Sequence, residues 1–197
     1  MALITKADIK TELQMADSVT TYDALLTQIA NAVQGAFEYL AGRSLEKAAL
    51  TEYHSPDKYD RMVFLKQFPV DTGETFKVWE DSSWDYDSDT LLSESDGDYQ
   101  IHVTKGIIYF NFDLGGGLDS IKVQYTAGYT AATLPAVIKQ VLVRQGAWWF
   151  EQSKNKEWAV TGKGIPSGGS VSYFRQEVGF LADFIKLADK VKMRSIV

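Results

Sequence analysis

Residues 20–42 read TTYDALLTQIANAVQGAFEYLAG, and this stretch has the clearest periodic pattern in the chain. Its apolar side chains recur three or four residues apart, which places them on one face of an α-helix. They are Tyr22, Leu26, Ile29, Val33, Phe37 and Leu40. Thr20 or Thr21 can cap the first amides, and Gly42 can take the left-handed conformation that ends a helix. The pattern predicts an amphipathic helix over residues 22–41.

Two further helices are predicted from their first turns. Thr5 followed by Asp8 forms an acidic variant of the capping box, so a short helix is expected over residues 5–13. Pro135 stands in the first turn of a second helix, where its missing amide costs nothing, and this helix is expected over residues 133–151. One face of it carries Ile138, Val141, Leu142, Gln145 and Trp148.

The end of the chain contains a loop and a last helix. Residues 152–174 are rich in Gly and Ser, which predicts a flexible loop. Residues 175–197 predict a C-terminal helix, because apolar residues recur at helical spacing and the basic end suits the helix dipole. Its apolar face consists of Phe180, Phe184, Leu187, Ala188 and Val191.

The middle of the chain changes to the pattern of β-strands. Six short segments are rich in β-branched or aromatic residues, and Pro, Gly or Asp clusters separate them. These segments are 50–54, 62–65, 75–80, 99–103, 107–112 and 120–125. Lys105-Gly106 predicts a hairpin turn between two of them. We therefore expect an antiparallel β region of four to six strands over about residues 50–126.

These elements predict an α+β fold in which N-terminal and C-terminal helices pack together and a central antiparallel β region lies between them in sequence. A length of 197 residues suits one domain, or one domain with an appendage. We place the main domain at residues 1–151, the flexible loop at 152–174 and the C-terminal helix at 175–197.

The formal net charge of −6 comes from one stretch of the chain. Residues 81–98 contain seven acids and no Lys or Arg, and the rest of the chain is close to neutral. Tight DNA binding requires a basic surface, so the charge pattern argues against it. We expect the acidic stretch to face solvent or to line a passage through which DNA slides.

Composition also limits the chemistry and the compartment. The chain has no cysteine, which excludes disulfides, thiolate zinc sites and cysteine nucleophiles. The N-terminus lacks the apolar core of a secretion signal, and no apolar run is long enough to span a membrane. We expect a soluble protein that is made in the cytoplasm and has no membrane partner.

The sequence offers no catalytic set and no cofactor site. His54 and His102 are the two histidines, and both lie in predicted strands outside any recognised motif. Residues 168–172 (GGSVS) lack the closing glycine of a serine-nucleophile turn. Residues 162–168 (GKGIPSG) resemble a phosphate-binding loop only superficially, because the lysine comes early and Pro166 removes an amide donor. We expect no enzymatic activity, no catalytic residue and no cofactor.

Asp85, Asp87 and Asp89 are weak candidates for metal ligands. Their spacing resembles the start of a calcium loop, in which clustered carboxylates bind a hard cation. Thr90 stands where that loop needs glycine, and Asp96 is shorter than the glutamate that binds in a bidentate manner. The sequence therefore favours a solvated acidic turn and predicts no metal site.

Residues 148–150 (WWF), together with Trp158, form the most aromatic stretch. Adjacent tryptophans on a helix cannot share one face, so we expect Trp148 in the core. Trp149 then needs a partner on another subunit or on the last helix. Aromatic side chains are enriched at the centres of interfaces. The interface candidates are Trp149, Trp158, Phe180 and Phe184.

The order of several short motifs resembles the head–tail connector family of long-tailed phages, whose members are also called adaptor or head-completion proteins. The motifs are YLAGRSL at 39–45, FPV at 68–70, GII at 106–108, VQYTAGY at 123–129 and LPAVIK at 134–139. Within them Gly42 allows the helix to stop, Gly128 is expected to take positive φ, and Pro135 begins a helix. The resemblance covers about residues 3–150.

The resemblance implies a non-enzymatic virion protein at the head–tail junction, made in the host cytoplasm. Twelve copies would form a ring below the portal, closed by head-to-tail contacts. Double-stranded DNA would pass through the ring without specific binding. The portal protein would contact one side of the ring, and a tail or stopper protein the other. The acidic stretch 81–98 and the residues after Lys154 depart from the compact family pattern.

Two alternatives stay open from the sequence. The chain could be another phage protein, such as a tail-completion protein. It could also be a calcium- or glycan-binding β module, in which Trp79, Trp84 and Tyr86 lie beside the acidic cluster.

Overall fold

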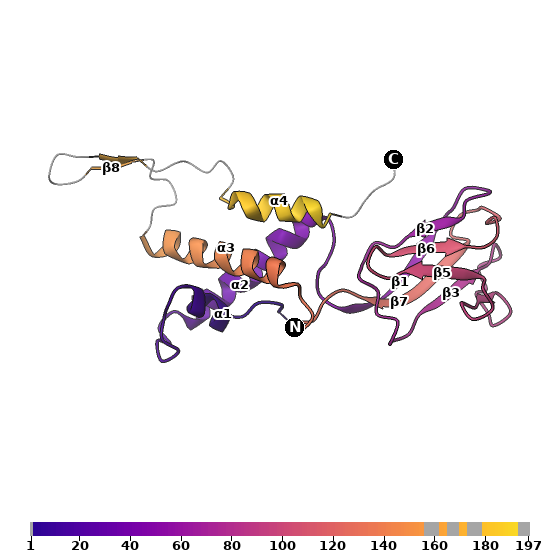
Figure 1. Ribbon diagram of the computed structural model, residues 1–197, viewed down its shortest axis with the longest axis horizontal. Coiled ribbons are helices and arrows are strands. Elements are labelled where there is room, and N and C mark those ends of the chain that lie inside the picture. The colour runs from indigo at the N-terminus through magenta and orange to yellow at the C-terminus, as the bar shows by residue number, and fades with distance from the viewer. Residues whose placement is uncertain (1, 156–161, 165–169, 173–178, 193–197) are drawn as a thin grey trace. The chain divides into compact units, whose positions relative to one another are not determined.

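The structure is a computed structural model that describes residues 2–155, 162–164, 170–172 and 179–192. The chain divides into two compact units, each considered by itself. The helical unit consists of residues 1–42 and 131–197, and the β unit consists of residues 43–130. Helices from both ends of the chain and antiparallel sheets from its middle confirm the predicted α+β class (Figure 1).

The helical unit contains four helices and one short strand pair among its described residues. The helices are α1 (Lys6–Glu12), α2 (Asp23–Ala41), α3 (Ala136–Asn155) and α4 (Ala182–Lys190), and the strands are β8 (Gly162–Gly164) and β9 (Ser170–Ser172). Helix α2 contacts the other three helices. The expected loop 152–174 therefore includes the end of α3 and the paired strands β8 and β9. Of the expected last helix at 175–197 the structure describes residues 179–192, in which α4 begins three residues after the first described position, and the remaining positions lie outside the described residues.

Helix α2 follows its predicted pattern on the buried face but not at its start. Leu26, Ile29, Val33 and Phe37 are buried, and Gly42 ends the helix with a φ of +66°. The N-cap residue is Tyr22, which makes no side-chain capping bond. The predicted threonine cap is therefore wrong, because Thr20 and Thr21 lie in the preceding turn, where the Thr20 carbonyl accepts from the Asp23 amide at 3.0 Å.

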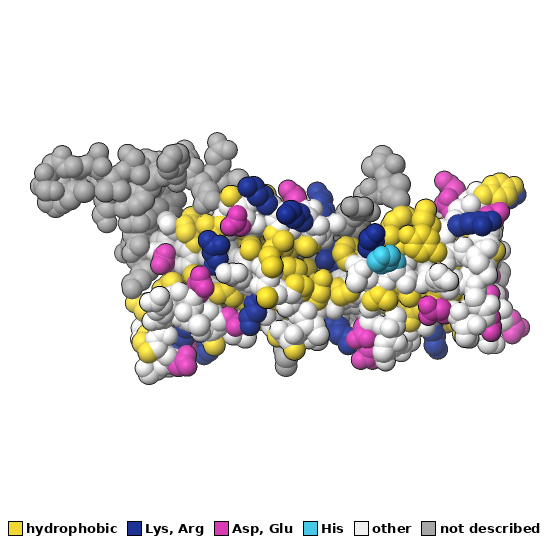
Figure 2. Space-filling view, viewed as in Figure 1, with side chains coloured by type: hydrophobic (Ala, Val, Ile, Leu, Met, Phe, Trp, Pro, Cys, Tyr) yellow, Lys and Arg dark blue, Asp and Glu magenta, His cyan; other side chains and the backbone are white. Residues whose placement is uncertain are grey.

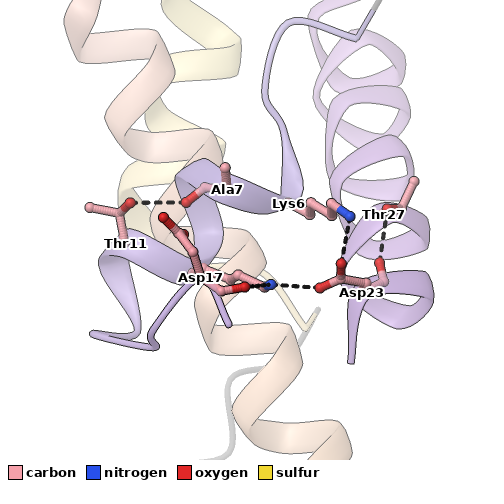
Figure 3. A network of polar contacts seen from close by, with 7 residues as sticks. Lys6, Ala7, Thr11, Asp17, Asp23 and Thr27 are labelled. Carbon is pink, nitrogen blue, oxygen red and sulfur yellow. Dashed lines mark hydrogen bonds and ion pairs between the residues drawn. The ribbon is translucent and has the colours of Figure 1, made fainter. Parts of the chain in front are cut away.

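Helix α1 is capped as predicted and is held by ion pairs to its neighbours. The Thr5 hydroxyl accepts from the Asp8 amide, and the Asp8 carboxylate accepts from the Thr5 amide at 2.8 Å. Figure 3 shows Lys6 pointing toward Asp23 in the first turn of α2, where the lysine Nζ lies 2.5 Å from an Asp23 carboxylate oxygen. Lys10 is only 3% exposed, and its Nζ lies 2.6 Å from an Asp23 carboxylate oxygen. The buried lysine thus links α1 to the first turn of α2.

Helix α3 buries a wider face than the sequence predicted. Ile138, Leu142 and Gln145 are buried as expected. The aromatic side chain of its second half that enters the core is Phe150, which packs edge-on against Tyr22 at 5.2 Å. Trp148 is only half-buried, so its predicted core position is wrong. The buried face of α3 is wider than one helical stripe because α3 contacts α1, α2 and α4.

The β unit consists of two antiparallel sheets on a shared core. The strands are β1 (Ala48–His54), β2 (Met62–Phe64), β3 (Lys77–Glu80), β4 (Leu91–Leu92), β5 (Tyr99–His102), β6 (Ile107–Phe110) and β7 (Ile121–Ala127). The first sheet has the order β1-β7-β3-β4 and the second has the order β2-β6-β5. The shared core consists of Val63, Leu65, Val70, Val78, Tyr99, Ile108, Phe110, Leu114, Ile121, Val123, Tyr125 and Ala127. Because both sheets contribute inward side chains to it, their outer faces lie on opposite sides of the unit.

Two turn predictions in the β unit are confirmed. Lys105 and Gly106 lie in the turn between β5 and β6, and both amides donate to the His102 carbonyl. Gly128 follows β7 with a φ of +108°. A Cβ at Gly128 would lie 2.6 Å from the Glu46 carbonyl oxygen, so only glycine fits this close approach of the backbone. The six predicted strands are present with small shifts, and β4 is an additional strand.

Candidate functional site

His54 lies in a polar cluster within the β unit. Glu52 is buried, and its carboxylate accepts hydrogen bonds from the Tyr125 hydroxyl and from the Lys66 amide, the latter at 3.2 and 3.3 Å. His54 Nε2 lies 3.2 Å from Glu52 Oε2, which makes an ion pair when the imidazole is protonated. The Tyr125 hydroxyl in turn accepts from the Gln67 amide at 3.2 Å. These bonds join β1, β7 and the chain after β2.

Two opposing effects set the protonation of this cluster. Burial raises the pKa of the Glu52 carboxyl, but hydrogen bonds from His54, Tyr125 and the Lys66 amide outweigh it and hold that pKa below its ordinary value. Burial, together with the neighbouring Glu52 carboxylate, raises the pKa of the Tyr125 hydroxyl. At neutral pH Glu52 is therefore ionised and Tyr125 is protonated, and their hydrogen bond is fixed in direction.

The other sequence motifs that suggested chemistry are strands or exposed positions. His102 is exposed on β5, and its Nδ1 lies 3.2 Å from the Thr104 hydroxyl. In the described part of the chain no acid lies within ion-pair distance of the His102 ring. Gly162–Gly164 pairs with Ser170–Ser172 as antiparallel strands, which is not the turn of a phosphate-binding loop. Trp158 and residues 165–169 lie outside the described residues.

The acidic stretch uses several of its carboxylates to build turns. Asp81 accepts from the Ser83 hydroxyl at 2.6 Å and from the Tyr86 amide at 2.8 Å, and the Ser83 bond is the main cause of its lowered pKa. Asp87 Oδ1 accepts from the Asp89 amide at 2.9 Å. Among the described residues no group of three acids, histidines or cysteines is placed to hold a metal ion. The arrangement of Asp85, Asp87 and Asp89 gives the calcium alternative no support.

Residues 81–90 cover part of the outer face of the first sheet. Trp79 on β3 is 7% exposed, and Lys122 of the adjacent strand β7 lies with its Nζ 5.0 Å from the Trp79 ring and 4.9 Å from the Tyr86 ring. The Tyr86 ring packs 5.7 Å from Tyr53 on β1. Trp84 Nε1 donates to the Leu118 carbonyl at 2.8 Å. A glycan-binding platform needs exposed rings with free polar edges, whereas here Trp79 is covered and Trp84 is bonded within the chain.

The predicted interface aromatics that the structure describes meet one another within the helical unit. Trp149 Nε1 donates to the Gly179 carbonyl at 2.8 Å, and its ring lies 5.8 Å from Phe180. Phe180 stacks on Phe184 with 5.3 Å between the ring centroids. Phe184 packs edge-on against Phe37 of α2 with a centroid distance of 5.2 Å. Phe184 is fully buried, so this chain of rings attaches α4 to α2 and α3. An interface role for Trp149 and Phe180, which are half-buried, stays a prediction.

A buried glutamine supports the same attachment. The Gln145 side chain on α3 accepts from the Leu181 amide at 2.7 Å and donates to the Gly179 carbonyl at 3.3 Å. Gln145 is fully buried, so its amide is satisfied by the backbone that leads into α4. A polar residue on an apolar helical face was the sequence signal for this contact.

One exposed apolar surface was missed by the sequence analysis. The second sheet presents Met62 and Phe64 on β2 and Ile107 and Tyr109 on β6 to the side away from the core, and we call these four residues the outer sheet face. Met62 and Tyr109 are paired across the strands and are 46% and 42% exposed. Figure 2 shows hydrophobic side chains gathered over β2 and β6. The signal in the sequence is Ile107–Phe110, a strand that is apolar on both faces.

An open hollow lies at one side of this surface. It is lined by Gln100, Ile101, His102, Val103, Thr104 and Tyr109. It is formed by β5, the adjacent residue Tyr109 of β6 and the turn after β5. Exposed apolar surface beside such a hollow is typical of a site that contacts another protein.

None of the helices in the described part of the chain has the length and apolar content that crossing a bilayer requires. No protein-family model and no curated protein matches the sequence.

Solved structures do match the chain over almost its whole length. One is the neck of an empty gene transfer agent (GTA) particle computed with C6 symmetry, with a TM-score of 0.55, 16% identity and coverage of 99% of this chain and 92% of that chain. A second is the virion of a native GTA particle, with a TM-score of 0.56, 15% identity and the same coverages. A third is the neck of a native GTA particle computed with C12 symmetry, with a TM-score of 0.51, 16% identity and coverage of 100% and 94%. At these identities the likeness establishes a shared fold.

Proposed function

We propose that this chain is a structural subunit of the neck that joins head and tail in a phage-like particle, and that it belongs to the head–tail connector family. One observation carries this proposal. The match to a GTA neck chain includes 99% of this chain and 92% of the neck chain. A match of this extent includes both the helical unit and the β unit, so it does not rest on one common motif.

The chain would act as a ring of identical subunits. The similar necks have C6 and C12 symmetry, which supports a ring of twelve. Rings close through head-to-tail contacts, in which two different surfaces of the same subunit meet. The portal protein would contact one side of the ring and a tail or stopper protein the other, as the sequence resemblance implies.

The charge of the β unit suits a protein that DNA passes without binding. Residues 43–130 contain 16 acids and eight bases. A surface with this excess of carboxylates repels phosphates and gives no counterion-release gain on contact with DNA. Double-stranded DNA would therefore slide through the ring without specific binding.

The polar groups that most resemble reactive sites have structural partners, which supports a non-enzymatic role. Glu52 accepts a hydrogen bond from the Tyr125 hydroxyl and lies 3.2 Å from His54, and Asp81 and Asp87 accept from local amides. The chain would work through its outer surfaces.

Deleting the gene for this chain from the genome of its particle tests the proposal. The expected result is an accumulation of heads and tails that are not joined, with normal tailed particles restored by the gene supplied in trans. Tailed particles that form and deliver DNA without the chain would overturn the proposal. Heads that join tails but leak DNA would instead favour a tail-completion role.

A further inference from the structure

We infer that the outer sheet face of one subunit binds the acidic segment of the next copy of this chain, defined as residues 84–91, and that this pairing is a contact of the ring. The inference rests on the proposed function and names two surfaces that would meet in it.

The outer sheet face is an apolar surface with a basic edge. Just past the end of β2, Leu65 is buried and Lys66 is exposed. Lys105, which is exposed, lies in the turn that joins β5 to β6. The Leu65 amide donates to the Gly106 carbonyl at 2.8 Å, which places Lys66 and Lys105 at the same end of the sheet. These two lysines stand beside an apolar surface in a unit that is otherwise acidic.

The acidic segment has the complementary chemistry. Trp84 is 57% exposed and Leu91 is 40% exposed. Between them Asp85, Asp87 and Asp89 are exposed, and no basic residue occurs in the segment. An apolar surface edged by lysines and an exposed segment in which apolar residues flank aspartates are complementary in both hydrophobicity and charge.

The positions of the two surfaces require a head-to-tail contact. The acidic segment is bonded to the outer side of the first sheet, through Tyr86 against Tyr53 and Trp84 against the Leu118 carbonyl. The outer sheet face belongs to the second sheet, on the other side of the shared core. Two subunits related by a twofold axis would bring like surfaces together, whereas a heterologous contact pairs each surface with its complement and repeats around a ring.

The absence of native cysteine allows a direct test by crosslinking. Gln100→Cys places a thiol beside Tyr109, its cross-strand neighbour, and Ser88→Cys places one in the acidic segment. The full-length chain carrying both substitutions is treated with a flexible bis-maleimide. The expected product is a ladder of covalent oligomers, while an equal mixture of the two single variants gives dimers and each single variant alone gives monomers.

Charge reversal provides a second, independent readout. Lys66→Glu with Lys105→Glu, or Asp85→Lys with Asp89→Lys, is expected to weaken self-association by about tenfold or more in sedimentation experiments. All four substitutions in one chain restore the opposite charges and are expected to restore association. The matched control for the lysine pair, Lys77→Glu with Lys192→Glu, makes the same change in net charge as Lys66→Glu with Lys105→Glu at positions outside both surfaces, and it is expected to leave association unchanged.

The outcomes separate this inference from the proposed function. Oligomers in the wild-type chain without a ladder in the double-cysteine variant, or without rescue by the fourfold charge swap, overturn the pairing and leave the neck role intact. A wild-type chain that stays monomeric at the highest concentration reached also overturns the pairing, and the gene deletion then decides the neck role by itself. Binding of a particle protein other than this chain to the outer sheet face, competing with the ladder, would assign the surface to that partner instead.

Discussion

Phe184→Ala tests whether the last helix belongs to the core of the folded subunit. Phe184 is fully buried, stacks on Phe180 and meets Phe37 edge-on. Truncating a buried phenylalanine to alanine costs about 3–5 kcal/mol through lost transfer energy and the cavity left behind. Two aromatic contacts are lost as well, so we expect a loss of about 4 kcal/mol in the unfolding free energy of the helical unit. Helix α4 has nine residues, which is too short for it to persist in water without this attachment.

The assay is urea unfolding followed by circular dichroism at the helical minimum, which weights the helical unit over the β unit. Val137→Ala on α3 is the matched control, because Val137 is 64% exposed and its loss is expected to change the unfolding free energy by less than about 0.5 kcal/mol. A loss below about 1 kcal/mol for Phe184→Ala, with an unchanged urea dependence, is not compatible with Phe184 at the centre of a packed core. It would mean that α4 is not part of the core of the free subunit.

Three further perturbations test other parts of the structure. Gly128→Ala should lower the unfolding free energy by about 2–4 kcal/mol, because an added Cβ would lie 2.6 Å from a backbone oxygen. Gly42→Ala has open space around it and should lower the unfolding free energy by about 1–2 kcal/mol. Equal losses in urea unfolding would show that the close approach at Gly128 has no energetic role. Glu52→Gln should reduce the dependence of stability on acid: the folded-state pKa of Glu52 is lowered, so its contribution is complete above the ordinary glutamate range near about pH 4.3 and is lost as the pH falls through the folded value. Unfolding curves of the two proteins between about pH 5 and pH 3 check this, and parallel losses would contradict it. Lys10→Met should lower the unfolding free energy by about 1–2 kcal/mol, because it leaves one carboxylate oxygen of Asp23 without its buried cation while Lys6 still pairs with the other oxygen. A gain in thermal stability would show that packing of the methionine stabilises the fold more than the ion pair does.

The sequence was most informative where one local signal decides the conformation. The three- and four-residue spacing of Leu26, Ile29, Val33 and Phe37 predicted the buried face of α2 correctly. The end of α2 at Gly42 was also predicted correctly, because it depends only on the ability of glycine to take the left-handed conformation. Helix boundaries were less accurate, because capping depends on turns such as the one that Thr20 makes with Asp23.

The arrangement of distant segments could not be read from local patterns. Residues 131–197 join residues 1–42 in one unit because α2 and α3 share a core, and no local signal in either helix specifies that partner. The order β1-β7-β3-β4 depends likewise on which strands bury complementary side chains. Trp148 was misplaced because a single-face pattern was applied to a helix that touches three others.

For the candidate surfaces too, the residues were easier to predict from the sequence than the partners that they contact. The sequence offered the last helix as one of two possible partners for Trp149, and Phe180 does pack against Trp149, whereas no local pattern pointed to Phe37 of α2 as the partner of Phe184. The outer sheet face was missed because Met62 and Tyr109 are separated by more than 40 residues and meet only through strand pairing. The acidic stretch was recognised, whereas its position over Trp79 depends on contacts with Lys122 that composition does not reveal.

Cryo-electron microscopy of the purified chain mixed with the portal protein of its particle tests the proposed role as one subunit of a neck ring. We expect a closed ring of twelve copies on one end of the portal, with helical and β units both fitting the density and an open channel on the axis. A portal that stays bare at saturating concentrations of the chain, or one that carries single copies without a ring, would contradict it.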